Sequence, residues 1–234
     1  MNKVELGSLK RHSHTLTESL RALRSNIQFC GDDIKTILFT SAMPDEGKST
    51  VVMDLARSIA EAGKRVLVID TDMRKSVLVG RLRAHASTEE KVYGLSHYLS
   101  GQQNMDRVFC MTNVPNLYLI FSGPSVPNPT EILEKEYFIR LLAFARENFD
   151  YVLVDSAPIG AAIDAAIIGK HCDGAILVTA QGMASAPMIN SVKRQLEVAG
   201  VHILGAVLNK VNMKKNSYYG KYYGSYYGHY GDKE

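Results

Sequence analysis

The side chains with the clearest chemical potential are one lysine and three aspartates, each placed next to an apolar run. Lys48 and Ser49 close the stretch SAMPDEGKST at 41–50, which follows the apolar run 36–40. Between a strand and a helix, such a loop binds phosphate through its N–H groups, while the lysine reaches the β and γ oxygens and the serine can bind Mg²⁺. Compared with the pattern G-x-x-x-x-G-K-[ST], the first glycine is replaced by Ala42. The stretch still predicts a phosphate-binding loop.

The acidic partners follow two other apolar runs. Asp70 and Asp72 follow 66–69, and Asp155 follows 151–154. Because the carboxyl ends of parallel strands line the ligand crevice, these side chains should meet Lys48 at one edge and form a Mg-nucleotide phosphoryl-transfer site. We expect catalytic roles for Lys48, Asp70, Asp72 and Asp155, Mg²⁺ binding by Ser49, Asp70 and Asp155, and ATP binding by Ala42, Pro44, Asp45, Glu46, Gly47, Lys48, Ser49, Thr50 and Asn209. For Asn209, a contact to adenine and a plain strand-end cap are both open.

The elements that must position these residues alternate between strand and helix. Apolar runs predict strands, helical spacing predicts the segments between them, and Thr130 is expected to cap one helix. Repeated βα units with apolar strands predict an α/β fold, a doubly wound and mostly parallel sheet with helices on both faces. The expected strands are 36–40, 66–70, 117–121, 151–155, 174–179 and 203–209, and the expected helices are 16–29, one from 51, 130–148, 161–170 and 186–199.

The same reading divides the chain into a flexible N-terminal arm at 1–14, a domain at 15–212 and a flexible tail at 213–234. Residues 75–108 look charged and irregular, with a short amphipathic segment at 94–101. The net charge of +3 is too small to indicate nucleic acid, and three scattered cysteines indicate a reducing compartment. Neither a signal peptide nor an apolar run of about 18 residues is present, so we expect a cytoplasmic protein, and any membrane attachment would come through a partner.

The tail is unlike the rest of the chain. From Ser217 it repeats tyrosine doublets and glycine, which predicts disorder, although a merely sticky low-complexity tail is an open alternative. About 24 flexible residues span roughly 25–30 Å, enough to reach a neighbouring subunit's site or the chain's own. There Asp70 or Asp72 could orient a phenol and take its proton. The tyrosines are Tyr218, Tyr219, Tyr222, Tyr223, Tyr226, Tyr227 and Tyr230.

Taken together, the loop at 42–50, the D-x-D after 66–69, the hhhhD run at 151–155 and the tyrosine-rich tail resemble the bacterial tyrosine kinases of capsule and exopolysaccharide synthesis. The resemblance implies a cytoplasmic P-loop kinase that phosphorylates its own tail and other protein tyrosines, and that is activated by a transmembrane adaptor at the inner face of the membrane. It also implies a ring-like homo-oligomer, with Glu18, Arg21 and Arg24 as the oligomerisation motif. Asp45 departs from the family's usual glycine.

Two other interpretations use the same fold. A MinD/ParA-like ATPase would switch with nucleotide without phosphorylating protein, but such proteins carry a second lysine five residues before the loop lysine, where this chain has Met43. A silent assembly module would use ATP only to oligomerise. We also expect tail phosphorylation to loosen the oligomer, because each phosphate adds about −1.5 to −2 of charge.

Overall fold

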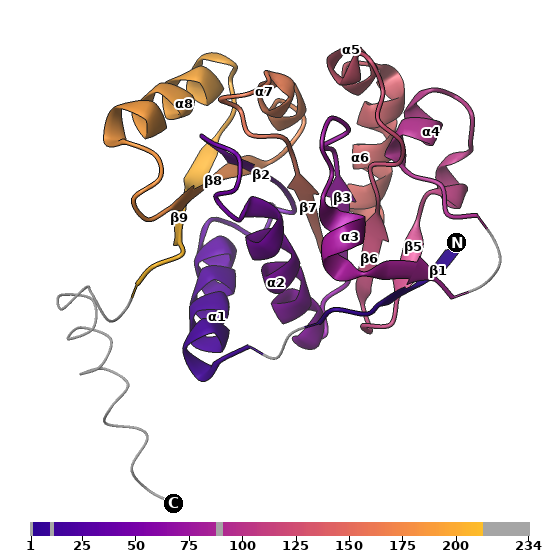
Figure 1. Cartoon of the computed structure of the whole chain (residues 1–234), viewed down its shortest axis with the longest axis horizontal. Helices are drawn as coiled ribbons and strands as arrows, with labels where there is room; N and C mark the ends of the chain where they lie inside the picture. The colour runs from indigo at the N-terminus through magenta and orange to yellow at the C-terminus, as the bar shows by residue number, and fades with distance from the viewer. Residues whose placement is uncertain (1, 10–11, 88–90, 213–234) are drawn as a thin grey trace, which may run out of the picture.

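The computed structural model describes residues 2–9, 12–87 and 91–212. Within these residues, one sheet of nine strands runs through the molecule in the order β4-β1-β5-β6-β3-β7-β2-β8-β9 (Figure 1). The strands are β1 (Asn2–Leu6), β2 (Thr36–Ser41), β3 (Val66–Asp70), β4 (Ala84–Ala86), β5 (Cys110–Thr112), β6 (Leu117–Ile120), β7 (Tyr151–Asp155), β8 (Gly174–Ala180) and β9 (Ile203–Asn209).

The central strands are parallel, and the antiparallel pairs lie toward one edge. β6, β3, β7, β2, β8 and β9 pair in parallel, whereas β5 with β6 and β1 with β4 are antiparallel. Every residue of β2 and β3 is buried, as expected for strands covered on both faces. The expected mostly parallel sheet is confirmed.

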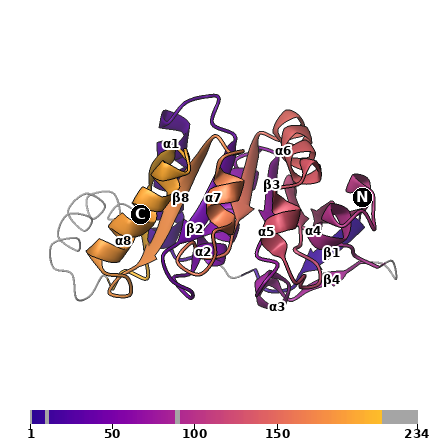
Figure 2. The ribbon, with the colours of Figure 1, turned by 90° about the horizontal axis from the view of Figure 1, so that it is seen from above.

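Helices cover both faces of the sheet, as the view from above shows (Figure 2). One face packs against α1 and α2 and the other against α6, α7 and α8, so two apolar layers lie on either side of the strands. The helices are α1 (His14–Phe29), α2 (Lys48–Glu61), α3 (Leu78–Leu82), α4 (Leu95–Leu99), α5 (Pro129–Leu133), α6 (Glu136–Asn148), α7 (Asp164–Gly169) and α8 (Ala186–Val198), with a 3-10 turn at Met105–Arg107.

Two parts of the sequence prediction are wrong. The expected flexible arm at 1–14 contains β1, whose Val4 and Leu6 are buried because the strand pairs with β5 and β4. The stretch at 75–108, expected to be irregular apart from a short amphipathic segment at 94–101, also contains α3 and β4, and α4 lies within that segment.

The single helix expected at 130–148 is two helices, α5 and α6, because Lys135 adopts an extended conformation between them. Thr130 is not a cap: Asn128 precedes the helix, and the Thr130 hydroxyl binds another side chain. No helix in the described part of the chain is both long and apolar enough to cross a membrane.

Candidate active site

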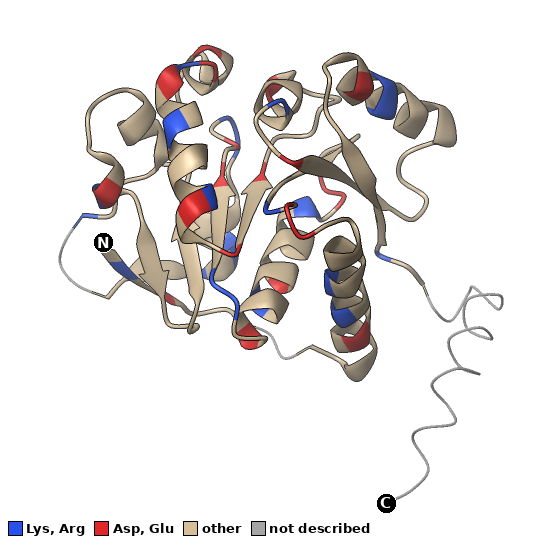
Figure 3. Cartoon of the chain, turned by 180° about the vertical axis from the view of Figure 1, so that it is seen from behind, with Lys and Arg blue, Asp and Glu red and all other residues tan. Residues whose placement is uncertain are grey.

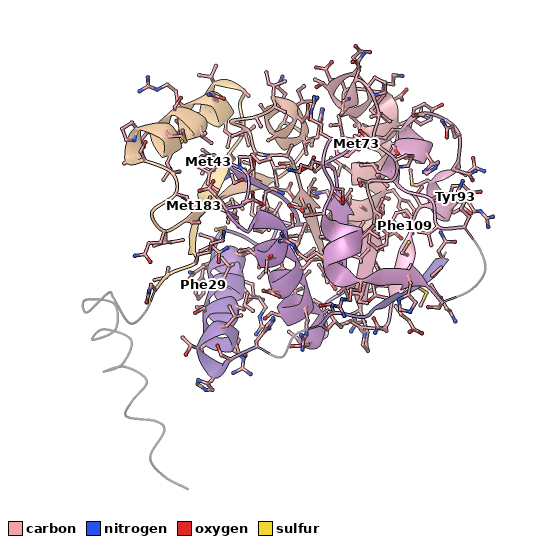
Figure 4. The ribbon with its side chains drawn as sticks, viewed as in Figure 1. Phe29, Met43, Met73, Tyr93, Phe109 and Met183 are labelled. Atoms are coloured by element: carbon pink, nitrogen blue, oxygen red, sulfur yellow. The ribbon has the colours of Figure 1, made fainter. Side chains whose placement is uncertain are left out.

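The ends of β2, β3 and β7 bring Lys48 and the acidic residues to one edge of the sheet. Asp70 and Asp155 face each other as register partners on neighbouring strands, and both are buried. Lys48, the first residue of α2, forms an ion pair through Nζ with Asp155 Oδ1, and the same Nζ lies 3.4 Å from Ser49 Oγ. Acidic and basic positions meet around the ends of the central strands (Figure 3). Met43 and Met73 lie in two of the loops at this edge (Figure 4).

The loop between β2 and α2 is shaped by two residues in left-handed conformation, Asp45 with φ 63° and Gly47 with φ 86°. A side chain at Gly47 would also place Cβ 2.3 Å from Asn209 Nδ2, so glycine is required there for space as well as for backbone. Asp45 tolerates the conformation less easily, because a Cβ disfavours it. The loop therefore opens directly into the N-terminus of α2, the geometry that favours phosphate.

Glu46 supports this loop from inside the protein. Its side chain is buried, Oε2 accepts from the Met43 N–H at 2.8 Å, and Oε1 accepts from the Thr179 hydroxyl at 3.0 Å and the Ala180 N–H at 3.1 Å. The carboxylate thus holds the loop against the end of β8. The expected part of Glu46 in ATP binding stays a prediction.

The end of β9 holds the loop from a second side. Asn209 Nδ2 donates to the Glu46 carbonyl at 2.9 Å, and Lys210 Nζ donates to the Asp45 carbonyl. Neither a strand-end cap nor an adenine contact is needed to explain Asn209, since its amide already serves the loop. The side-chain oxygen of Asn209, Oδ1, takes no part in this hydrogen bond.

Asp70 is the acid most affected by its surroundings. Burial, and next the negative charge of Asp155, raise the pKa of Asp70 to about 7, although hydrogen bonds from the Ser76 hydroxyl and the Asp72 N–H act in the opposite direction. A carboxylate in this setting is stabilised by a cation, so the pair of buried acids fits a divalent metal ion bound with phosphate.

Asp72 differs from Asp70 in being partly exposed. Its Oδ1 accepts hydrogen bonds from the N–H groups of Arg74 at 3.3 Å and Lys75 at 3.0 Å. The carboxylate is thus held by its own loop while one side reaches the surface. Of the two acids after β3, Asp72 is the one that an incoming protein side chain can approach.

The donor set agrees with magnesium better than with a protein-enclosed metal. No cluster of three or more His, Cys, Asp or Glu side chains able to hold a metal ion occurs among the residues that the structure describes. Mg²⁺ keeps several waters and usually takes one or two carboxylates together with substrate phosphates. Asp70, Asp155 and the hydroxyl of Ser49 beside a phosphate loop are such a set.

The remaining expected site residues lie in different settings. Ala42 is buried, Pro44 is exposed, and the Thr50 hydroxyl accepts a hydrogen bond from Arg81 of α3. In α1, Glu18 pairs with Arg21 at 2.6 Å, whereas Arg24 donates to the Ser58 carbonyl of α2 at 2.8 Å. The tail tyrosines fall outside the described residues.

Several side chains at this edge were missed by sequence reasoning. Ser76, Thr179 and Lys210 bind the loop or its acids, and Arg74 binds Asp164 and Thr130. Most of these contacts join residues far apart in the chain, and no local spacing reveals them. Arg74 and Ser76 follow the D-x-D motif closely enough to have been candidates.

Comparison with known proteins identifies the family of the chain. The family model described as an AAA domain matches residues 34–216. The tyrosine-protein kinase CpsD of Streptococcus agalactiae serotype III is 40% identical over 219 residues, 93% of each chain. CpsD of Streptococcus pneumoniae serotype 4 is 44% identical, over 86% of this chain and 87% of the relative. The chain belongs to the bacterial tyrosine-kinase family.

Solved structures separate this family from the other interpretation. The kinase domain of Escherichia coli tyrosine kinase ETK is 30% identical with a TM-score of 0.76, covering 88% of this chain and 86% of that one. The septum site-determining protein MinD of Pyrococcus horikoshii, complexed with Mg-ADP, is 24% identical with a TM-score of 0.61, over 75% and 70% of the chains. MinD therefore shares the fold, and family membership lies with the kinases.

Proposed function

We propose that this protein is an ATP-dependent protein-tyrosine kinase that phosphorylates the tyrosines of its own C-terminal tail. The observation that carries the proposal is the meeting of Lys48, Asp155 and Asp70 at the mouth of a phosphate loop, with the partly exposed Asp72 beside them. The family's named tyrosine kinases support the reaction.

In the proposed reaction, the tyrosine Oη attacks the γ-phosphorus of ATP, the bond from that phosphorus to the β–γ bridging oxygen breaks, and ADP leaves. Asp72 accepts the proton of the hydroxyl. Lys48 turns from Asp155 to the β and γ oxygens, and the N–H groups of the loop orient the phosphates. Because the transition state is loose, positioning and charge neutralisation matter more than base strength.

Magnesium belongs to the same proposal. Ser49, Asp70 and Asp155 would hold Mg²⁺, which when bound neutralises charge on the β and γ phosphates. Asp70 must be ionised in that state, and the proton that it holds near neutral pH is then released. Asn209 would meet the adenine with the amide oxygen that the loop does not use.

The assembly and its partners follow from the family resemblance. We propose a ring-like homo-oligomer in which α1 carries the contact through Glu18, Arg21 and Arg24, and a transmembrane adaptor that brings the kinase to the inner face of the membrane. Phosphorylation of the tail would regulate capsular or exopolysaccharide synthesis. It would also loosen the ring, because the phosphates add negative charge near three aspartates. Native mass spectrometry before and after phosphatase treatment tests the last point; an unchanged assembly would contradict it.

The test of the kinase reaction uses the full chain with Mg-ATP, followed by mass spectrometry of the C-terminal peptide. We expect phosphotyrosine in the wild type and none in Lys48→Met. Equal phosphorylation of both would overturn the role of Lys48. A wild type that hydrolyses ATP but never gains phosphotyrosine would favour a nucleotide switch instead.

A further inference from the structure

Arg74, Thr130 and Asp164 form a hydrogen-bonded cluster next to the candidate active site, in which the Asp164 carboxylate is buried while the Arg74 side chain is 42% exposed. Asp164 is the first residue of α7 and is only 1% exposed. Arg74 binds it through two nitrogens, Nε to Oδ2 at 3.0 Å and Nη2 to Oδ1 at 3.2 Å. The Thr130 hydroxyl of α5 donates to Asp164 Oδ1 at 2.6 Å and accepts from Arg74 Nη2 at 3.0 Å.

The cluster joins three segments that are distant in the chain. The loop after β3 reaches up between α5 and α7, and these two helices contact each other (Figure 1). A buried carboxylate needs a partner, and the planar guanidinium of Arg74 matches both oxygens of Asp164. The hydrogen bond to Asp164 also raises the pKa of Arg74. Because the Thr130 hydroxyl binds both Arg74 and Asp164, it also helps to fix the geometry of the Arg74–Asp164 pair.

What makes the cluster relevant to the reaction is the backbone that Arg74 carries. The N–H groups of Arg74 and Lys75 donate to Asp72 Oδ1, and the Asp72 N–H donates at 3.1 Å to Asp70 Oδ1. The carboxylate of Asp72 is therefore oriented by a loop whose next residues are pinned by the side chain of Arg74. A shift of about 1 Å in such a group can reduce a rate 10²-fold.

We propose that Arg74, Thr130 and Asp164 are positioning residues that hold Asp72 in the orientation needed to take the tyrosine proton. The inference rests on the proposed function, in which Asp72 is the acceptor. It separates two tasks at one edge of the sheet: Lys48 and the phosphate loop bind nucleotide, whereas the cluster aligns the acid that meets the protein substrate.

The separation makes the proposal testable by comparing nucleotide affinity with the rate of transfer. Thr130→Val keeps the shape of the side chain and the Arg74–Asp164 pair but removes the hydroxyl. Arg74→Lys keeps the charge but loses the planar fork. We expect both variants to bind a fluorescent ATP analogue within about twofold of wild type, with kcat for tail phosphorylation reduced about 10- to 100-fold. Arg140→Lys, which alters an exposed arginine fork to Glu136 on α6, is the matched control and should leave kcat unchanged.

A double-mutant cycle with Asp72→Asn distinguishes positioning from general support of the fold. If the cluster acts through Asp72, adding Thr130→Val to Asp72→Asn should lower kcat no further, because the group that it aligns is already gone. Additive losses in the double variant, or an unchanged kcat in both Thr130→Val and Arg74→Lys, would overturn the inference. Unchanged phosphorylation in Asp72→Asn alone would instead overturn the proposed role of Asp72. Thr130→Val keeps the test available even where Arg74→Lys fails to fold.

Discussion

Glu46→Gln tests whether the phosphate loop depends on a buried carboxylate. Glu46 is 1% exposed, and its two oxygens accept three hydrogen bonds, from the Met43 N–H, the Thr179 hydroxyl and the Ala180 N–H. Glutamine has the same shape but offers one acceptor and one donor group. One end of the new amide must therefore point an N–H₂ group at a donor, and that conflict is the perturbation.

The magnitude follows from which end changes. The amide oxygen does best at the Oε1 position, where it serves two donors, so the N–H₂ group faces the Met43 N–H at the Oε2 position. One hydrogen bond to a charged group, about 1.5–3 kcal/mol, is lost, and a backbone donor is left buried without its acceptor. We expect the free energy of unfolding to fall by about 2–3 kcal/mol. Because Met43 begins the loop, nucleotide affinity should fall about tenfold or more.

Urea unfolding and titration with a fluorescent ATP analogue measure the two effects. The control is Glu61→Gln at the end of α2, a side chain that is 58% exposed and paired with Arg57 in an i,i+4 arrangement. An exposed pair of this kind contributes about 0.3–0.5 kcal/mol, so the control should stay close to wild type. If Glu46→Gln is as stable as Glu61→Gln and binds nucleotide equally well, the carboxylate does not support the loop and the reasoning fails.

Three further predictions concern the same edge of the sheet. Because the pKa of Asp70 is raised to about 7 in the folded, metal-free protein, the free energy of unfolding of wild type should fall as the pH rises from about 4 to 7. Asp70→Asn lacks this loss. Urea unfolding should therefore show the variant more stable relative to wild type at pH 8 than at pH 4, by roughly 2–4 kcal/mol. A constant difference at all pH values would contradict this. Asp45→Gly should relieve a left-handed residue and remove a negative charge near the phosphates, so calorimetry should show ATP binding several-fold tighter; weaker binding would show that the carboxylate assists the loop. Asn209→Ala removes the hydrogen bond to the Glu46 carbonyl and should weaken ATP binding by about 1 kcal/mol, and an unchanged dissociation constant would exclude this support.

The centre of the sheet could be predicted from sequence because each of its strands has a clear pattern in the local sequence. β3 and β7 are continuous apolar runs that each end in aspartate, and burial on both faces leaves no other role for them. β1, β4 and β5 are short, from three to five residues, and β1 forms by pairing with segments about 80 to 110 positions away, as Val4 does with Ala86 and Thr112. Such pairing leaves little trace in local composition.

The candidate site divides in the same way. Lys48, Asp70, Asp72 and Asp155 could be placed together because a parallel sheet collects strand ends at one edge. What holds them there could not be predicted. Thr130 was expected to cap a helix, but it turns its hydroxyl to Asp164, 34 residues away. The Glu46 carboxylate binds Thr179, 133 residues away. Each depends on the packed structure rather than on spacing in the sequence.

The pairing of Lys48 with Asp155 shows how the site manages charge before nucleotide arrives. Both side chains are buried, and a buried ion without a partner would destabilise the fold. In the absence of nucleotide, the Lys48 ammonium therefore pairs with the Asp155 carboxylate. The second acid, Asp70, forms no ion pair with any residue in the described part of the chain, and burial together with the charge of Asp155, only partly offset by Lys48, raises its pKa to about 7. Binding of ATP with Mg²⁺ would replace both the Lys48–Asp155 ion pair and the proton on Asp70. Phosphate oxygens would then bind Lys48, and the metal would bind the two carboxylates. Phosphate that binds Lys48 frees Asp155 for the metal, and metal that binds Asp155 frees Lys48 for phosphate. We therefore expect ATP and Mg²⁺ to bind cooperatively, with a lower affinity for ATP in the absence of Mg²⁺ than in its presence.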